Sequence, residues 1–143
     1  MKATTRPLTS YQNTVAHIIR IAREYTQDVS GFDNFFQLYN YVRDLPYKSD
    51  PVNQETVSRF LYTKNYDFPI RDCDDKTVPL VSYAILKKIP VRVVVCGEIE
   101  TPHHVYPEIF FGDSWLPADA TYDDRCSFGK YLYNEKFRKI FSV

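Results

Sequence analysis

The spacing of apolar residues changes between the two halves of the chain. In the first half, apolar residues recur every three or four positions, which predicts helices. The four expected helices cover residues 14–25, 32–45, 54–62 and 75–88. Gly31 separates the first two, Pro46 ends the second, and Pro90 follows the fourth, which is apolar enough to be mostly buried.

The second half is rich in β-branched and aromatic residues, which are typical of strands. The expected strands are residues 91–97, 104–111 and 114–119, with one or two more within 130–141. Gly112 and Asp113 predict a tight turn between the second and third strands. Pro107 favours an edge strand or a bulge. Helices followed by consecutive strands predict an α+β fold with an antiparallel sheet.

Composition limits the classes of protein to which the chain can belong. With 143 residues, 44% of them hydrophobic, the chain predicts one domain spanning residues 1–143. The 18 basic and 18 acidic residues balance, which argues against a specific nucleic-acid partner. We find no apolar run long enough to span a membrane and no signal peptide. The three cysteines are an odd number without close spacing, which favours free thiols in a reducing compartment.

Cys73 lies in the polar stretch RDCDDK, at or just before the predicted buried helix. Free N–H groups and the helix dipole favour an anion there, and such a site lowers the pKa of a cysteine from its usual value of about 8.5. Asp72 and Asp75 are suited to cap the helix. The three neighbouring carboxylates oppose ionisation of the thiol unless they point away from it.

His104 opens the second predicted strand and Asp119 ends the third. A hairpin at residues 112–113 would place the two strands side by side and bring these residues to one end of the sheet. Together with Cys73, they would form a nucleophile, a base and a group that orients the base. His103 competes for the role of base, because alternation along a strand places it on the opposite face.

Each of these residues also has a purely structural interpretation. Cys73 can be a small buried hydrophobic residue, Cys96 lies in an apolar run that favours the core, and Cys126 lies in a polar loop as an incidental thiol. No cysteines or histidines have the spacing of a zinc site. The aspartates around Cys73 lack the glycine and closing glutamate of a calcium loop. We therefore expect neither a metal nor a cofactor.

Four elements in order resemble the transglutaminase-like superfamily of papain-related cysteine enzymes. The first is Asp-Cys followed by an apolar helix, and the second is a Gly-Ile-Pro-x-Arg strand, here with Lys88 in place of glycine. The third is a strand of the form His-Val-Tyr-x-Glu. The fourth is a tryptophan followed by Asp-Pro-Thr, here with Ala120 in place of proline. The matching segments, together with an upstream YVRDLPYKSDPVNQETV segment, lie within residues 35 to 125.

The resemblance implies a nucleophile helix packed on an antiparallel sheet, as in the core shared by transglutaminase-like and papain-like enzymes. It implies that Cys73 is the nucleophile, that His104 rather than His103 is the general base, and that Asp119 orients His104. The reaction would form a thioester acyl-enzyme from an amide or ester, released by water in a peptidase or by an amine in a transferase. The Cys73 N–H would be one oxyanion donor, and no second donor is assigned.

The compact form of the segment resembles the short transglutaminase-like proteins of tailed bacteriophages. It implies a peptidase rather than a crosslinking enzyme, a protein or peptide substrate, virion proteins as further partners, and a location in the bacterial cytoplasm or the virion. Two further departures from the family pattern lie close to the sulfur. Arg71 replaces a glycine, and Pro79 is expected to kink the nucleophile helix or delay its start. These departures support an alternative, a virion protein that keeps the fold without catalysis.

Overall fold

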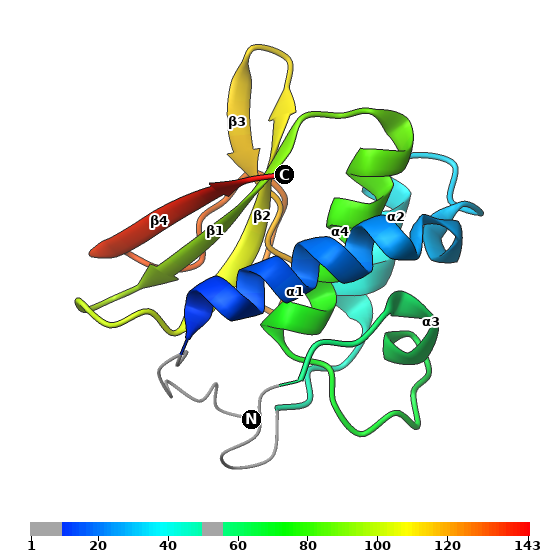
Figure 1. Cartoon of the computed structure of the whole chain (residues 1–143), viewed down its shortest axis with the longest axis horizontal. Coiled ribbons are helices and arrows are strands. Elements are labelled where there is room, and N and C mark those ends of the chain that lie inside the picture. The colour runs from blue at the N-terminus through cyan, green and yellow to red at the C-terminus, as the bar shows by residue number, and fades with distance from the viewer. Residues whose placement is uncertain (1–9, 50–55) are drawn as a thin grey trace.

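The computed structural model describes residues 10–49 and 56–143, which form helices followed by one antiparallel sheet (Figure 1). The helical elements are α1 (Tyr11–Glu24), the 3-10 helix η1 (Thr26–Val29), α2 (Phe35–Asp44), α3 (Phe60–Thr63) and α4 (Cys73–Lys87). The strands are β1 (Val91–Gly97), β2 (His104–Phe111), β3 (Ser114–Pro117) and β4 (Phe137–Ser142), in the order β3-β2-β1-β4. This arrangement confirms the predicted α+β class.

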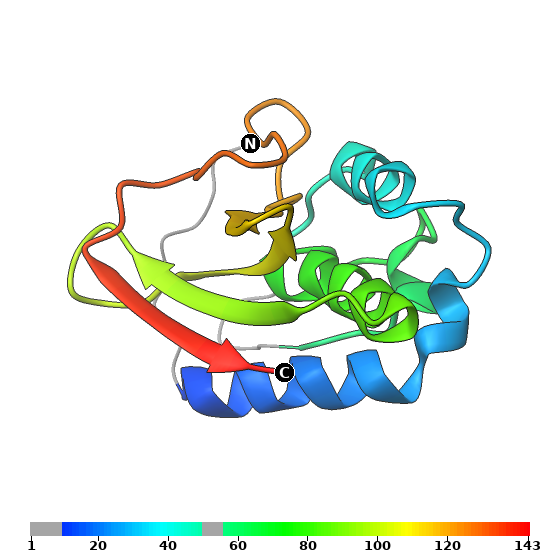
Figure 2. The same cartoon turned by 90° about the horizontal axis from the view of Figure 1, so that it is seen from above.

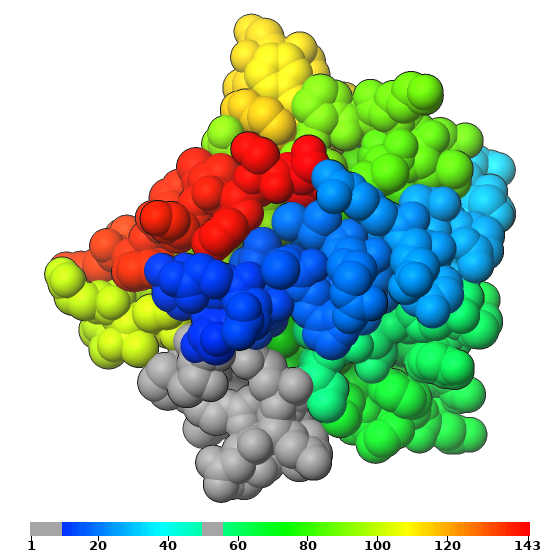
Figure 3. All heavy atoms as spheres, in the orientation of Figure 1, coloured from blue at the N-terminus to red at the C-terminus, as the bar shows by residue number. Residues whose placement is uncertain are grey.

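Helix α4 is the central element of the fold. It lies between α1 and α2, as Figure 2 shows, and it packs against β1 and β2. Its apolar side chains, with those of α1, α2 and one face of the sheet, make the main hydrophobic core. Figure 3 shows α1 beside β4 on one face of the molecule. The β2–β3 hairpin projects from the rest of the molecule at the top of this view. Almost the whole first half of α4, including Cys73, is thereby removed from solvent.

The described helices differ from the predicted ranges mainly at their starts. Helix α1 begins three residues earlier than expected. Helix α2 begins at Phe35 because the Asn34 side chain accepts a hydrogen bond of 2.9 Å from the Gln37 N–H, which makes Asn34 its N-cap. Helix α4 begins at Cys73 and continues through Pro79, so the expected delay of its start is wrong.

The predicted helix over 54–62 is wrong in most of its described part. Residues 54 and 55 lie outside the described residues, 56–59 are not helical, and only Phe60–Thr63 forms a helical turn. Two tertiary contacts explain the difference. The Ser58 N–H donates to the Asp75 carboxylate at 2.8 Å, and Arg59 pairs with Asp28 at 2.7 Å. These partners compete with the local helical hydrogen bonds, and tertiary context overrides the helical period.

The sheet also departs from three expectations. The third strand ends at Pro117, and of the predicted range 130–141 only the last part joins the sheet, as β4. Pro107 lies in an inner strand, not at an edge. It is tolerated because β3 pairs with β2 only from Glu108 onward, so the side of Pro107 that lacks an N–H faces no partner strand. Its carbonyl instead accepts from the Ala118 N–H at 2.8 Å.

Candidate functional site

A capping box fixes the start of α4 at Cys73. The Asp72 carboxylate accepts from the N–H groups of Asp74 and Asp75 at 3.1 and 3.4 Å, and the Asp75 carboxylate accepts from the Asp72 N–H at 3.1 Å. Both predicted caps are therefore confirmed. The N–H of Cys73, the first helical residue, donates no hydrogen bond within residues 10–49 and 56–143. One free donor thus lies beside the thiol.

Arg71 holds the loop that leads into Cys73. Its backbone has no positive φ, so this conformation does not require a glycine. The side chain is 0% exposed, and its guanidinium donates three hydrogen bonds of 2.7 Å to main-chain carbonyls. Two of these carbonyls belong to Thr63 and Asn65, and the third to Pro46. Arg71 and Lys48 also exchange main-chain hydrogen bonds of 2.8 and 2.9 Å. Arg71 is thus a structural anchor.

Lys76 joins α4 to the segment that carries Asp119. Its ammonium group is buried and donates to the carbonyls of Leu45, Arg43 and Thr121 at 2.5, 3.2 and 2.9 Å. Burial lowers its pKa to about 8, so the group is still mostly protonated at pH 7. This contact fixes the Asp119 segment relative to the first turn of α4, on which Cys73 lies.

His104 and Asp119 form a buried hydrogen-bonded pair. His104 Nε2 lies 2.6 Å from Asp119 Oδ2, and both side chains are almost completely excluded from solvent. Asp119 Oδ1 accepts from the Thr121 hydroxyl and N–H at 2.6 and 3.1 Å. Burial opposes ionisation of Asp119, but His104 and these hydrogen bonds outweigh burial and hold its pKa below the usual value. Asp119 is therefore a carboxylate, Nε2 carries a proton, and Nδ1 of a neutral ring can accept one.

The Cys73 thiol, in the first turn of α4, forms no hydrogen bond with this pair within the described residues. Sγ donates to Asp74 Oδ1 at 3.7 Å, and among the described residues no hydrogen bond joins it to His104. The main-chain N–H of Val105, the residue after His104, favours the ionised form of the sulfur and so acts to lower the pKa of the thiol. The structure therefore brings His104 and Asp119 together, whereas the thiol is bonded to Asp74.

The expected lowering of the Cys73 pKa is wrong for this state of the thiol. Burial, and then the carboxylates of Asp74 and Asp72, raise its pKa well above the usual range, and the Val105 N–H offsets only part of this. The prediction failed because Asp74 does not point away from the thiol. Its side chain is 1% exposed and faces the sulfur. The resting group is a neutral thiol.

The other residues considered from sequence have structural environments. His103 is half-buried and accepts from the Glu98 N–H at 3.3 Å, so it does not share the Asp119 pair. Cys96 is fully buried, as predicted. Cys126 is also buried, and its sulfur accepts from the Tyr122 N–H at 3.4 Å, which corrects its assignment as an incidental loop thiol.

Three tyrosines lie within electrostatic range of the thiol, and no sequence motif had pointed to them. The ring centroids of Tyr47 and Tyr122 lie 4.7 Å apart, and Tyr133 meets the His104 ring edge-on at 5.0 Å. Among the causes that raise the pKa of each tyrosine is the Cys73 thiol, so all three lie within electrostatic range of it. Tyr122 follows Asp119 by three residues, which was the one available signal.

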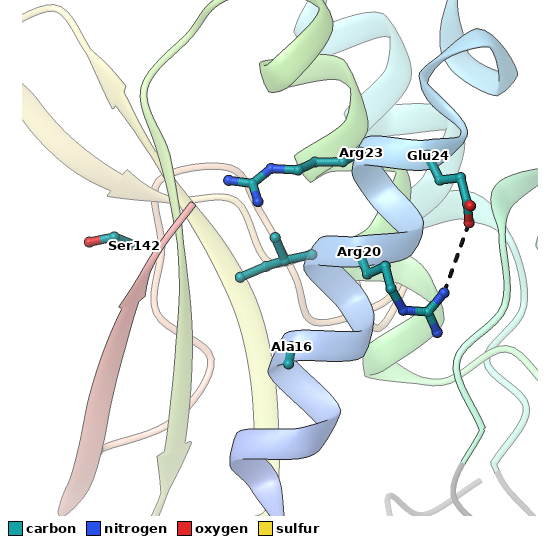
Figure 4. A pocket seen from close by; sticks show the side chains of 6 residues that line it. Ala16, Arg20, Arg23, Glu24 and Ser142 are labelled. Atoms are coloured by element: carbon teal, nitrogen blue, oxygen red, sulfur yellow. Dashed lines mark ion pairs between the residues drawn. The ribbon is translucent and has the colours of Figure 1, made fainter.

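Two surface hollows differ in their relation to this cluster. One of about 360 Å³ is lined by Tyr131, Tyr133, Asn134, Glu135 and Arg138. Since Tyr133 also contacts the His104 ring, this hollow borders the site. A larger hollow of about 520 Å³ lies between α1 and the end of β4 (Figure 4). There Arg20 turns toward Glu24, and Arg23 extends toward the strands. None of its lining residues belongs to the cysteine site.

Within residues 10–49 and 56–143, no three His, Cys, Asp or Glu side chains are grouped to hold a metal ion. In the same residues, no helix has both the length and the apolar character needed to cross a membrane. Comparisons with family models, curated proteins and solved structures find no match to the chain. The chemistry of the site therefore has to be argued from its own residues.

Proposed function

We propose that the chain is a cysteine-dependent hydrolase or acyl transferase of the transglutaminase-like type, acting on amide bonds, with peptide hydrolysis favoured over crosslinking. Cys73 is the nucleophile, His104 the general base, and Asp119 the residue that orients the base. The observation that carries the proposal is the buried 2.6 Å contact between His104 and Asp119, beside the helix end that presents Cys73. These three residue types are the parts of a nucleophile–base–orienter set.

The resting thiol is neutral, so attack requires a base at the moment of reaction. In the proposed step, Sγ leaves Asp74 and faces His104, whose Nδ1 takes the thiol proton as the C–S bond forms. The Cys73 N–H stabilises the oxyanion, and His104 then returns the proton to the departing amine. The effect of the Val105 N–H on the pKa of the sulfur supports this step, because Val105 adjoins His104 in the chain.

The substrate and location rest on the sequence resemblance. The likeness to short bacteriophage proteins supports a protein or peptide substrate, virion proteins as partners, and a place in the virion or the cytoplasm of the bacterial host. The hollow that borders His104 supports the approach of a substrate from the side of Tyr131 and Tyr133, because it is open to solvent there and already lined by aromatic rings.

One observation favours a second candidate, a non-catalytic virion protein that retains the fold. The thiol is bonded to Asp74, which raises its pKa, and it is not bonded to His104 in the described structure. A protein that no longer needs the nucleophile could hold a neutral cysteine in this way.

Acylation by p-nitrophenyl acetate separates the two candidates. An enzyme of the proposed kind acetylates Cys73 much faster than Cys96 or Cys126, and intact-mass and peptide mass spectrometry locate the thioester. His104→Gln is expected to slow acetylation about 100-fold through loss of the base. His103→Gln is the matched control on the neighbouring residue and leaves the rate unchanged.

Cys73→Ala is expected to abolish the acetylation while changing the thermal midpoint little. Equal acetylation of the three thiols, or a His104→Gln variant as fast as the wild type, would refute the enzyme proposal and favour the non-catalytic one. A peptide-library screen with the wild type and Cys73→Ala then tests amide cleavage.

A further inference from the structure

A second set of buried side chains lies on the face of the sheet that turns away from α4. Along β2, His104, Tyr106 and Glu108 are spaced two residues apart and so share this face. Tyr106 packs there with Val94 and Cys96 in a small cluster separate from the main core. Figure 2 shows the segment that precedes β4 on the same side of the sheet, opposite α1. The proposed base thus shares a face with side chains outside the main core.

Ion pairs and hydrogen bonds link the polar side chains of this face. The Glu108 carboxylate is 0% exposed and pairs with Arg92 at 2.8 Å and with Arg138 at 2.7 Å. Arg138 also donates to the Tyr106 hydroxyl at 2.8 Å and to Glu135 at 2.9 Å. The Tyr106 hydroxyl in turn donates to Glu135 at 2.7 Å. Since a phenol has one proton to donate, these two charged neighbours fix the orientation of the hydroxyl.

The ring of Tyr106 contacts the ring of His104 directly. The two rings are stacked, with centroids 5.8 Å apart and planes 28° apart, and Tyr133 meets the His104 ring edge-on at 5.0 Å. Both distances are those of favourable aromatic contacts. The hydrogen bond from Nε2 to Asp119 holds one atom of the His104 ring, but a single bond leaves the tilt of the ring free. The two tyrosine rings restrict this tilt, and with it the direction of Nδ1, the atom proposed to accept the Cys73 proton.

We propose that Tyr106 is a positioning residue for His104, and that the ion pair of Arg138 with Glu135 holds Tyr106 in place; this inference rests on the proposed function. Tyr106 takes no part in bond making. It keeps Nδ1 of His104 where it can take the thiol proton, and a displacement of about 1 Å in a reacting group can cost about 100-fold in rate. Loss of the Tyr106 hydroxyl alone should cost less, because the ring is 2% exposed and packing still confines it.

Acetylation of Cys73 by p-nitrophenyl acetate, measured in single and double variants, tests this role. Tyr106→Phe keeps the ring and removes the hydroxyl, and it is expected to slow acetylation about three- to tenfold. In the His104→Gln background, the same change should alter the remaining rate by less than about 1.5-fold, because Tyr106 acts only through His104. A general loss of stability, or an effect on reagent binding in the neighbouring hollow, would persist in that background.

Tyr83→Phe is the matched control for removal of a buried tyrosine hydroxyl. Tyr83 is likewise 2% exposed, and its hydroxyl donates to the Phe32 carbonyl at 3.3 Å, so it takes no part in the network around Tyr106. Because the two sites share no partner, Tyr83→Phe is expected to change the acetylation rate less than about twofold.

Glu135→Gln supplies a second test that does not depend on the folding of Tyr106→Phe. The Glu135 side chain is 9% exposed, and glutamine has nearly the same size but no charge to pair with Arg138. Charge-assisted hydrogen bonds are about twice as strong as neutral ones, so the hold on Tyr106 weakens and acetylation is expected to slow about two- to fivefold. The rate in the His104→Gln background should again stay unchanged.

The outcome that overturns the role of Tyr106 differs from the one that overturns the proposed function. Unchanged acetylation in either folded variant, or a fall that is equally large in the His104→Gln background, would overturn the positioning role. A wild-type Cys73 acetylated no faster than Cys96 and Cys126, or a His104→Gln variant as fast as the wild type, would instead overturn the proposed function itself.

Discussion

Arg71 provides the most direct test of how the loop before Cys73 is held. The variant Arg71→Met keeps an unbranched apolar chain but removes the guanidinium and its three hydrogen bonds of 2.7 Å. The carbonyls of Thr63, Pro46 and Asn65 are left without this donor. The side chain is wholly buried in the wild type, so methionine can occupy much of the same space.

The size of the effect follows from the environment of each bond. A hydrogen bond from a charged group contributes about 1.5–3 kcal/mol, and a buried unsatisfied carbonyl costs about 1–3 kcal/mol. The bond to Thr63 is buried, whereas those to Pro46 and Asn65 are only partly buried, so water can replace the donor there. Burial of the guanidinium, which lowers its pKa, offsets part of the gain. We therefore expect the free energy of unfolding to fall by about 3–4 kcal/mol.

Urea unfolding followed by circular dichroism measures this change, and the thermal midpoint should fall by about 10 °C for a chain of this size. Arg71→Lys should recover less than half of the loss, because a single ammonium cannot reach three carbonyls arranged around a planar fork. Arg20→Met is the matched control. Its exposed ion pair with Glu24, at 3.9 Å, should be worth less than about 0.5 kcal/mol. An Arg71→Met protein within 1 kcal/mol of the wild type (roughly the net value of a single hydrogen bond) would refute the anchoring role.

Three further outcomes follow from single contacts. Asp74→Asn removes the carboxylate that faces Cys73, so the pKa of the thiol should fall and the pH profile of its alkylation should move to lower pH; a profile that stays in place contradicts this electrostatic account. Lys76→Met leaves three carbonyls without their donor and should lower the free energy of unfolding by about 2–4 kcal/mol in urea titrations. Gly97→Ala places a methyl group against the main chain of the β1–β2 loop and should destabilise by about 1–3 kcal/mol, whereas Gly31→Ala, with open space, should be near neutral by the same assay.

The direction in which the alkylation rate of wild-type Cys73 changes with pH is also predicted. Because burial raises the pKa of Cys73 above that of an unfolded thiol, the thiolate fraction, and with it the alkylation rate, should still be rising above pH 9. The unfolded chain ionises this thiol at lower pH than the folded chain. The contribution of the buried, neutral Cys73 thiol to the stability of the folded chain is therefore complete below about pH 8.5. It is lost as the pH rises above that value.

Local patterns of the sequence were sufficient for the α+β class and for most element positions. The helical period is strong where α1, α2 and α4 form, and β1 and β2 have the predicted bounds, because these segments bury a continuous apolar face. The capping role of Asp72 and Asp75 was also predictable from local sequence, since a capping box joins residues only three positions apart. Asp119 and His104 could be placed together because a short hairpin joins their strands.

Only the tertiary structure decided the remaining features of the site. The direction of the Asp74 side chain, and with it the pKa of Cys73, depends on what packs around the helix end. The use of Arg71 as an anchor depends on carbonyls from two separate segments, one at the end of α3 and one at Pro46. The approach of Tyr122 to Tyr47 joins positions far apart in the chain. Burial and long-range hydrogen bonds set the charge state of a group, and neither leaves a periodic signal in the sequence.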